Sequence, residues 1–525
     1  MEVLHMPIYT FVFIKVLLMR LSFIKDYKEA IIIVSCLLTV IIAPLALIGF
    51  SIFVLYRSLI EWILKRIYGE DYLGIMEGID SISCICVNCN PFLVALVDFD
   101  GELDELKTLL HDQIGQLMKT QHQRLFCLRA SFLGYHYFYK YNLKPEDLIS
   151  VMKHTGVGVM NKRQFSETLS VYDEKPMPMN DRALFQILLC PERIEVDGNK
   201  VVPIMYRVHH CVADGKSLLH LFSGVLADNK NGSIKAPQKP IQQVESRKID
   251  VGRAVQFMKD VHIAELPFTQ FDDNCLRGLN LVESKHFVWF AESQPVYLQK
   301  IKKLRKTLSG VAFLDIINTC LASSLHDHYQ KSGKPMPKDV IGGIVLSPET
   351  SNSYMTYGSQ EFTLQNRFTA SGVRLPINID GETGNKLLTR LRLVKRQYDA
   401  IKKAFDVQFS YWVTQNIVSS IPWPFSKWLA YKLQITVGIS SLPGCDYFTF
   451  FKGHDVKEFI LCPPNSPGTG LHIIIYTYGG NLKLSMSVDK SIIPNREDAQ
   501  EIIDKIVYYV DELTKACEET TNIIL

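Results

Sequence analysis

A long uncharged segment near the amino terminus limits the folds open to this chain more than any other feature. No Asp, Glu, Lys or Arg occurs from Ala30 to Tyr56. As a helix, this segment is about 40 Å long at 1.5 Å per residue, which exceeds the roughly 30 Å hydrocarbon core of a bilayer. The sequence therefore predicts a transmembrane helix over residues 30–56, within a membrane anchor formed by residues 1–66.

Two other interpretations of this segment stay open. A secretory signal peptide has an apolar region of only about 7–15 residues before its cleavage site, whereas this segment is longer and leads into Arg57. A buried helix of a soluble protein is the second alternative, although ordinary core helices are shorter. Pro44 and Gly49 permit a kink or a re-entrant hairpin. Residues 7–24 are apolar apart from Lys15 and Arg20, so we expect an interfacial helix there.

Charge and cysteine content narrow the class of protein. The net charge of +3 is small, and no basic run alternates with aromatic residues, so we expect no nucleic-acid partner. Twelve scattered cysteines are typical of a reducing compartment and not of a disulfide framework. Cys84, Cys86 and Cys89 form a CxCxxC motif, but no second cluster with zinc-like spacing follows. The alternation over residues 82–87 favours a half-buried strand over a metal site.

The segment from His209 to Gly215 reads HHCVADG, an HHxxxDG motif. Residues 202–208 before it have the composition of a strand and residues 216–226 after it have helical apolar spacing, so His210 is expected on a strand-to-helix loop. An imidazole with a pKa of about 6.5 suits the removal of a proton from an alcohol near neutral pH. Asp214 is expected to fix the surroundings of the ring by charge or by an Asx-type turn, and Gly215 to allow a backbone bend.

The alternative to a catalytic motif is a chance surface turn or a buried core histidine. From this composition, HHxxxDG arises by accident about once in a thousand such chains, so the motif favours catalysis. A metal site is less favoured, because adjacent histidines point in different directions and no HExxH or CxxC partner lies nearby. We therefore predict a general base and no metal.

Further blocks in the same order resemble the wax ester synthase/acyl-CoA:diacylglycerol acyltransferase (WS/DGAT) family of the chloramphenicol-acetyltransferase-like superfamily. The resemblance spans about residues 73–515. Ala183, Leu314 and Ser441 depart from the residues that the family has at these positions, so the chain resembles a divergent member. The blocks are Asp181-Arg182-Ala183-Leu184-Phe185 (like DRPLW), Leu314-Asp315 (like Asn-Asp), Asn366-Arg367-Phe368 (like a block led by Gly-Asn) and Ser440-Ser441-Leu442-Pro443-Gly444 (like SNVPGP).

The resemblance implies an α/β fold of two chloramphenicol-acetyltransferase-like subdomains around a central tunnel, with His210 midway along it. We expect the first subdomain over residues 73–227 and the second over residues 249–515. Between them, residues 228–248 are polar and rich in helix breakers, which predicts a crossover linker.

The resemblance also implies an acyl-CoA donor and a long-chain fatty alcohol or diacylglycerol as the acceptor, without a cofactor. His210 would be the general base, His209 would pack against the fold, and Ser440 or Ser441 would stabilise the oxyanion. The alternative for the two serines is a turn before Pro443 and Gly444. With acyl-CoA and reduced cysteines, the catalytic domain is expected on the cytosolic side of a membrane, in the endoplasmic reticulum.

Two other functions remain possible from the sequence. One is a membrane-anchored lipid-binding protein that has lost turnover, and the other is a condensation-type transferase that acts on carrier-bound thioesters. The apolar stretch of residues 417–428 and Trp412 either line an acyl tunnel or contact the bilayer, although core packing is the default for aromatic residues at this density.

Overall fold

The computed structural model describes residues 28–85, 89–120, 122–228, 274–277, 281–282, 284–292, 294–347, 363–379, 385–403, 406–430, 435–464 and 468–519, with residues 10, 14, 15 and 466. The expected linker over residues 228–248 lies outside the described residues apart from Asp228. The expected interfacial helix over residues 7–24 also lies outside them, apart from three residues.

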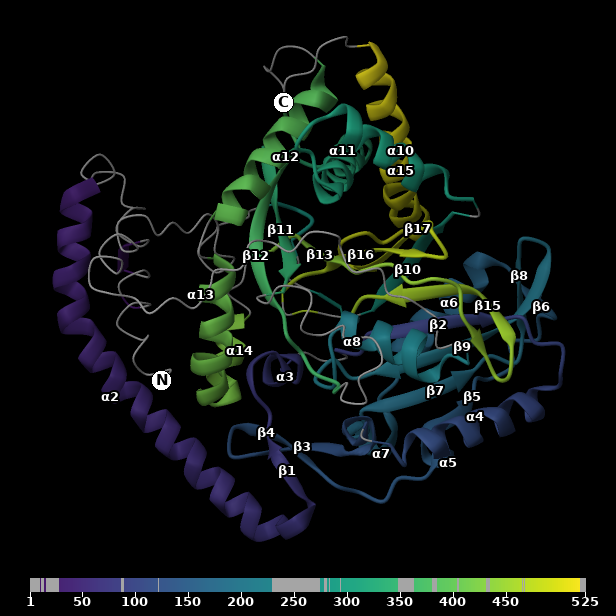
Figure 1. Cartoon of the computed structure of the whole chain (residues 1–525), viewed down its shortest axis with the longest axis horizontal. Helices are drawn as coiled ribbons and strands as arrows, with labels where there is room; N and C mark the ends of the chain where they lie inside the picture. Colours follow the sequence, from purple (N-terminus) through teal and green to yellow (C-terminus); the bar gives the residue numbers. More distant parts are fainter. Residues whose placement is uncertain are drawn as a thin grey trace.

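The strands form two large sheets and one small one (Figure 1). The first large sheet has the order β14-β15-β2-β9-β7-β5, with β8 pairing β9 and β6 pairing β8, and the second has the order β10-β17-β16-β13-β11-β12. The small sheet has the order β1-β4-β3. The strands are β1 Tyr72–Ile75, β2 Phe92–Val97, β3 Leu128–Phe132, β4 Tyr135–Tyr139, β5 Ile149–Val151, β6 Val159–Met160, β7 Phe185–Leu189, β8 Arg193–Val196, β9 Asn199–Val208, β10 Lys285–Ala291, β11 Asp339–Leu346, β12 Thr369–Pro376, β13 Val437–Ser441, β14 Thr449–Phe450, β15 His454–Cys462, β16 Leu471–Tyr478 and β17 Asn481–Asp489.

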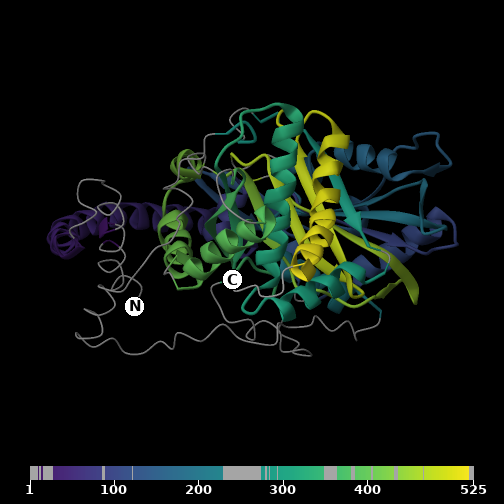
Figure 2. The same ribbon diagram turned by 90° about the horizontal axis from the view of Figure 1, so that it is seen from above.

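Helices cover the outer faces of the sheets. α11, α12 and α15 lie together over the second sheet, and α4 and α5 lie beside the first (Figures 1 and 2). The helices are α2 Lys28–Tyr68, η2 Gly69–Asp71, α3 Gly78–Ser83, α4 Leu103–Leu117, η3 Gln123–Phe126, α5 Pro145–Leu148, α6 Lys162–Asp173, α7 Pro178–Asp181, α8 Gly215–His220, η4 Leu221–Leu226, α10 Val296–Thr307, α11 Phe313–Ser332, α12 Lys386–Lys403, α13 Asp406–Trp412, η6 Val413–Val418, α14 Trp423–Ala430 and α15 Arg496–Glu519.

Burial explains why the most apolar segments form central strands. All six residues of β2 are buried, and β2 pairs antiparallel with β9 on one side and β15 on the other. A segment buried on both faces needs no polar alternation, so its continuous apolar sequence is expected. The strand that the sequence predicts over residues 92–97 is confirmed, as are strands within β7, β9, β10 and β11 and helices within α4, α11 and α15.

The two halves of the chain share the first sheet. β14 and β15 follow β13 of the second sheet in the chain, yet β15 pairs with β2, with Phe459 opposite Ala95. Two tyrosines of β16 tie the sheets together, because Tyr476 Oη donates to the Phe459 carbonyl and Tyr478 Oη to the Val456 carbonyl, each at 2.6 Å. The expected second subdomain over residues 249–515 thus contributes strands to the sheet of the first, and the α/β class is confirmed.

Of the predicted strand over residues 82–87, the described residues 82–85 are not a strand, so that prediction is wrong for them. α3 covers Gly78–Ser83, a turn follows at Cys84 and Ile85, and residues 86–88 lie outside the described residues. The helix is set by a contact distant in sequence, since the Gly78 N–H donates to Ser419 Oγ at 2.5 Å. Gly78 has φ of 50°, a left-handed backbone conformation that glycine adopts without a Cβ clash.

α2 is one continuous helix that passes through Pro44 and Gly49, so the re-entrant hairpin is wrong. A long apolar stretch within Ile33–Asp71 has a mean hydropathy of 2.6 and is almost entirely exposed, which makes it long and apolar enough to cross a membrane. Its carboxyl-terminal end has a different environment. Ile60 and Leu64 are buried in the core of the first half, and Tyr68 hydrogen-bonds Tyr137 at 2.8 Å between hydroxyls. The helix is therefore joined rigidly to the folded body.

This dual character predicts different outcomes for two identical substitutions in α2. Leu64→Ala should lower the free energy of unfolding in detergent by about 2–5 kcal/mol, because Leu64 is fully buried. Leu45→Ala should change it by less than about 0.5 kcal/mol, because that side chain is 65% exposed. Thermal unfolding of the two purified variants measures both. Equal effects would contradict the assignment of Leu64 to the core.

Candidate functional site

Both histidines of the HHxxxDG motif lie on the loop between β9 and α8, as the sequence predicts. Their backbone is held by neighbouring segments. The His209 N–H donates to the Leu184 carbonyl at 2.8 Å, and the His210 N–H donates to the Cys89 carbonyl at 2.9 Å. Leu184 precedes β7, whose first residue Phe185 pairs with Val208 of β9. The predicted Leu184 and Phe185 therefore support the histidine loop directly.

The two rings have different environments. His209 is 1% exposed, and its Nδ1 accepts a hydrogen bond from the Cys211 N–H at 3.2 Å. Burial holds the pKa of His209 well below its usual value, and the nearby Arg129 guanidinium adds to this shift. This is the environment of a packing residue.

His210 is the more accessible of the two histidines. Its ring is half-buried, 5.6 Å from the Phe368 ring between centroids. Its Nδ1 is shielded from solvent, so Nε2 is the nitrogen that remains for a ligand. Burial lowers the pKa of His210, while its own carbonyl, Asp214 and Asn366 oppose that shift. The ring is therefore neutral near neutral pH.

Asp214 acts on the backbone. Its Oδ1 accepts from the Ser217 N–H at 2.8 Å and caps α8, and its Oδ2 accepts from the Arg367 N–H at 3.0 Å. Asp214 thus holds the backbone as the predicted turn role requires, and its charge also raises the pKa of His210 against the effect of burial. Because Arg367 belongs to the second half of the chain, the same carboxylate joins the two halves beside His210.

Asp80 and Arg124 also support the loop, and sequence analysis missed both. Asn366 donates through Nδ2 to the His210 carbonyl at 2.6 Å and to Asp80 Oδ1 at 2.8 Å. Arg124 pairs with Asp80 and donates to the Cys211 carbonyl at 2.7 Å. Burial raises the pKa of Asp80, although Arg124 and Asn366 oppose the shift. Neither residue lies in a local motif, so the sequence offers no signal for them.

Gly215 is required for a reason other than the predicted one. It lies at the start of α8 and has no positive φ, so the expected backbone bend is wrong. A Cβ built on Gly215 would lie 2.9 Å from both methyl groups of Leu442, which is closer than real Cβ contacts. Gly215 therefore allows the segment after β13 to approach the histidine loop.

Ser440 and Ser441 are the last two residues of β13, opposite Ile474 and Ile475 of β16, so the alternative of a turn is wrong for them. Leu442 continues this extended pairing, since its N–H donates to the Ile475 carbonyl at 2.9 Å. Side chains two residues apart on a strand share a face, so Ser440 shares the face of Leu442 toward the histidine loop. Among the described residues, neither serine hydroxyl makes a hydrogen bond.

The remaining residues from the family blocks have structural positions. Gly444 lies so close to Thr477 that a Cβ would overlap its hydroxyl, and the half-buried Pro443 precedes it. Asp181 pairs with Arg129 and accepts from the Met177 N–H at 3.0 Å.

Asp315 lies in the second half of the chain, in the first turn of α11. Its Oδ2 accepts from the Ala312 N–H at 2.8 Å, which caps the helix. Burial raises the pKa of its carboxyl group.

Three possible metal ligands meet behind the histidine loop. Potential ligand atoms of Cys84, His209 and Cys211 lie within 4.8 Å of one another. Two features disfavour a cation there. The His209 Nδ1 lone pair is used by the Cys211 N–H, and the positive charge of the Arg129 guanidinium lies close to Cys84. The prediction of no metal stays a prediction.

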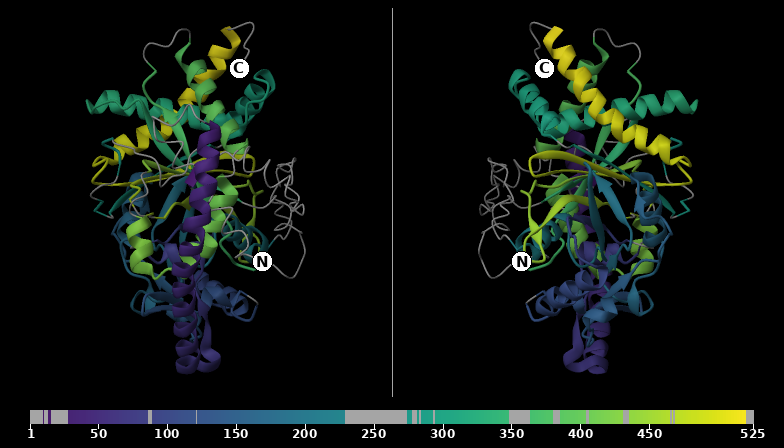
Figure 3. Two further views of the ribbon diagram at one scale, coloured as in Figure 1. Left: turned by 90° about the vertical axis from the view of Figure 1, so that its left-hand side faces the viewer. Right: turned by 90° about the vertical axis from the view of Figure 1, so that its right-hand side faces the viewer.

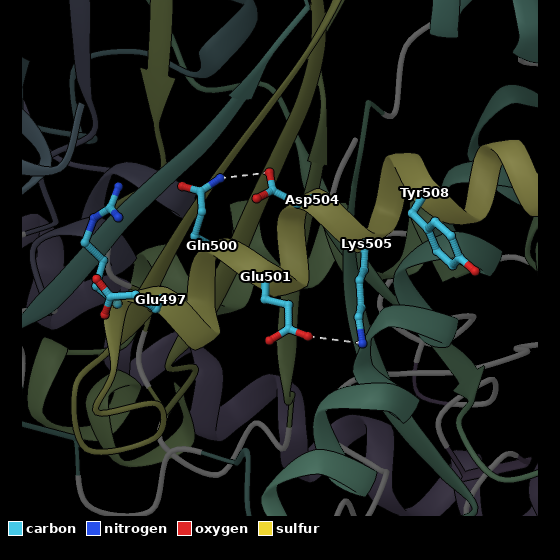
Figure 4. Close-up of a pocket in the computed structure, with 7 residues that line it drawn as sticks. Glu497, Gln500, Glu501, Asp504, Lys505 and Tyr508 are labelled. Carbon is cyan, nitrogen blue, oxygen red and sulfur yellow. Dashed lines mark hydrogen bonds and ion pairs between the residues drawn. The ribbon is translucent and has the colours of Figure 1, made fainter. Parts of the chain in front are cut away.

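A separate hollow lies on the exposed face of α15 (Figure 4). Its lining is polar and charged and includes Glu501 and Lys505, which pair at 3.2 Å. All seven lining side chains come from this one helix, and none belongs to the site described above.

Comparison with known proteins relates the second half of the chain to one family. The sequence model of the WS/DGAT C-terminal domain matches residues 364–513. This range begins at the segment that contacts Asp214 and contains Asn366, Leu442 and Gly444. A search among curated protein sequences finds no match.

Solved structures share the fold. A wax ester synthase/diacylglycerol acyltransferase from Marinobacter aquaeolei VT8 superposes with a TM-score of 0.54 at 12% identity, over 85% of this chain and 100% of the other. The trichothecene 15-O-acetyltransferase TRI3 from Fusarium sporotrichioides gives a TM-score of 0.55 at 12% identity, over 83% of this chain and 95% of the other. The first condensation domain of the calcium-dependent antibiotic synthetase gives a TM-score of 0.51 at 11% identity, over 86% of this chain and 99% of the other. At these identities the likeness shows the fold alone.

The contact between Gly215 and Leu442 predicts a rescue. Gly215→Ala should lower the free energy of unfolding by about 1–3 kcal/mol, because the added methyl group overlaps Leu442. Adding Leu442→Ala should recover much of this loss, so the two substitutions should couple in a double-mutant cycle of thermal unfolding. Gly115→Ala in α4 is the control, since the nearest atom to its Cβ is 4.0 Å away. If the effects of the Gly215 and Leu442 substitutions on the free energy of unfolding were strictly additive, the close approach of Leu442 to Gly215 would be contradicted.

Proposed function

We propose, on the premise that residues 364–513 form a WS/DGAT C-terminal domain on an acyltransferase fold, that this protein is a membrane-bound O-acyltransferase. It moves a long-chain acyl group from acyl-CoA to a fatty alcohol or to diacylglycerol. The family match favours this activity over that of a condensation-type transferase, whose likeness to the chain rests on the fold alone.

The environment of His210 is the observation that carries the proposal. This ring is half-buried at the junction of the two halves, and burial keeps it neutral with Nε2 as the remaining acceptor. A neutral imidazole at the meeting point of two subdomains suits a base that removes a proton from an alcohol. His209 is buried and hydrogen-bonded to the backbone, which leaves it a supporting role.

The reaction needs one proton carrier and no covalent enzyme intermediate. His210 Nε2 takes the hydroxyl proton as the alcohol oxygen attacks the thioester carbonyl carbon. The tetrahedral intermediate then collapses, the carbon–sulfur bond breaks, and the imidazolium returns the proton to the CoA thiolate. The products are an ester and CoA, and the ring is neutral again.

Ser440 is the preferred candidate for stabilising the oxyanion. It shares the face of Leu442, which contacts the histidine loop at Gly215, whereas Ser441 points to the other face of β13. A hydroxyl donor near the developing negative charge stabilises the transition state most strongly where water is excluded.

The membrane location follows from α2 and from the product. A long-chain ester is nearly insoluble in water, and each CH₂ group buried in a bilayer contributes about 0.8 kcal/mol. α2 is long and apolar enough to hold the enzyme at such a surface. We propose the endoplasmic reticulum with the catalytic domain in the cytosol, where acyl-CoA is available.

Removal of the base tests the activity. His210→Ala should lower the rate of ester formation by about 10²–10⁴-fold, because a positioned general base contributes that much. The assay uses purified membranes, labelled palmitoyl-CoA and a panel of alcohols with diacylglycerol. His209→Asn is the matched control, since the amide oxygen can replace Nδ1 as acceptor for the Cys211 N–H. A larger loss in the control would assign the base to His209, and no product from the unsubstituted protein with any acceptor would favour a lipid-binding protein.

The pH dependence gives an independent test. The base must be unprotonated, so kcat/KM should rise with pH through the pKa of His210 and then level off. Because burial lowers that pKa, the midpoint of the rise should lie below the ordinary histidine value of about 6.5. The measurement is the rate with a soluble alcohol across a pH range in which the protein stays folded. A midpoint above the ordinary value would mean that a neighbouring anion controls the ring.

A further inference from the structure

We propose that α14 and the turn between β3 and β4 form a second membrane-docking surface, which rests on the lipid bilayer beside α2. The docking platform consists of Phe53 and Tyr56 of α2, Leu133 of the turn, and Phe425 and Trp428 of α14. Its occupant is a phospholipid surface. α2 alone would anchor the chain, whereas the platform fixes the orientation of the folded body against the bilayer.

Specific contacts bring these three elements together. The Phe53 and Phe425 rings meet edge to face with centroids 6.2 Å apart, and Tyr56 Oη donates to the Leu133 carbonyl at 3.1 Å. The Trp423 N–H donates to the Gly134 carbonyl at 2.7 Å, which joins α14 to the turn. Figures 1 and 3 show α2 running alongside α13 and α14.

The level of the platform matches the edge of a bilayer. Phe53 and Tyr56 lie in the last turn of the uncharged segment, directly before Arg57. A helix that crosses a membrane leaves the hydrocarbon core where its first charged residues appear, and aromatic residues concentrate at that depth. Because Phe425 contacts Phe53, α14 lies at the same depth.

The exposed side chains of the platform suit lipid better than water. Leu133 is 56% exposed, Phe425 is 61% exposed and Trp428 is 67% exposed. Phe425 and Trp428 are three residues apart on one helix face. Lys427 between them is exposed, with its Nζ 6.0 Å from the Trp423 ring, and an ammonium group there suits phosphate headgroups.

The turn between β3 and β4 also supports contact of the docking platform with lipid. Leu133 and Gly134 form a two-residue hairpin connection with φ of 45° and 90°. Asn-Gly is the usual sequence of such a turn, because Asn tolerates a left-handed backbone and hydrogen-bonds water. Leucine is strained there and gains nothing from exposure to water. Contact with acyl chains would offset that strain.

The platform is connected to the candidate site through α3. η6, between α13 and α14, packs on α3, where Ser419 accepts from the Gly78 N–H. Asp80, which also belongs to α3, accepts a hydrogen bond from Asn366. Asn366 in turn donates to the His210 carbonyl. Bilayer contact at α14 would thus connect the candidate site to the membrane surface, where a lipid acceptor is held. This delivery step rests on the proposed function, whereas docking does not.

Tryptophan quenching in the full-length protein tests docking directly. The protein and its Trp428→Phe variant are reconstituted into phosphatidylcholine vesicles with brominated acyl chains. We expect bromine to quench a component of the fluorescence that is missing in the variant. An identical quenched component in both proteins would overturn the proposal. The proposal would also be overturned if lipid did not quench the Trp428 fluorescence and this fluorescence changed when a dimer dissociated. A second copy of the chain would then cover α14.

Kinetics separate delivery from chemistry. Phe425→Ser/Trp428→Ser should raise KM for an acceptor presented in vesicles by roughly tenfold, since each aromatic side chain loses part of its transfer free energy. Activity on a short, soluble alcohol should be unchanged. The control is Val171→Ser/Tyr508→Ser, which removes exposed apolar side chains from α6 and α15. Equal losses on vesicle-bound and soluble acceptors would place α14 in the acyl path and not on the membrane. Absence of activity in the unsubstituted protein would refute the proposed function and leave the quenching result valid.

Discussion

The histidine loop depends on one half-buried ion pair. Arg124 pairs with Asp80, and together with Asn366 these side chains occupy the carbonyls of His210 and Cys211. Removing one partner of this pair would leave the other charge, and the carbonyls that it helps to hold, without compensation in a half-buried site. The three residues come from α3, η3 and the segment before β12. The loop therefore has its shape only when both halves of the chain are in place.

Backbone contacts, more than side-chain contacts, position the candidate base. Asp214 binds two N–H groups, one from α8 and one from Arg367, and among the described residues no carboxylate hydrogen-bonds the imidazole of His210. A ring without a strong anionic partner keeps a low pKa when it is buried. The Asp214 contacts thus explain the position of His210, whereas burial explains its lowered pKa against the opposing effect of the Asp214 charge.

α2 connects an exposed apolar segment to the folded body that carries the histidine loop. Its amino-terminal part is exposed and apolar, whereas Ile60 and Leu64 belong to the core of the first half. The apolar segment and the folded body therefore share one continuous helix, which restricts how one can rotate against the other. The docking platform adds further contacts beside it, which restrict the orientation of the body at the bilayer surface.

The sequence determined the features that arise from local pattern. It placed His210 between β9 and α8, the apolar helix before the folded body, the core strand β2 and the helices α11 and α15, because periodicity and burial act within one element. Tertiary structure alone decided the rest. Residues 82–87 have the alternation of a strand, yet a contact with Ser419 stabilises α3 there. Asp80, Arg124 and Leu442 reach the loop from distant segments, and their roles depend on contacts that no local spacing encodes.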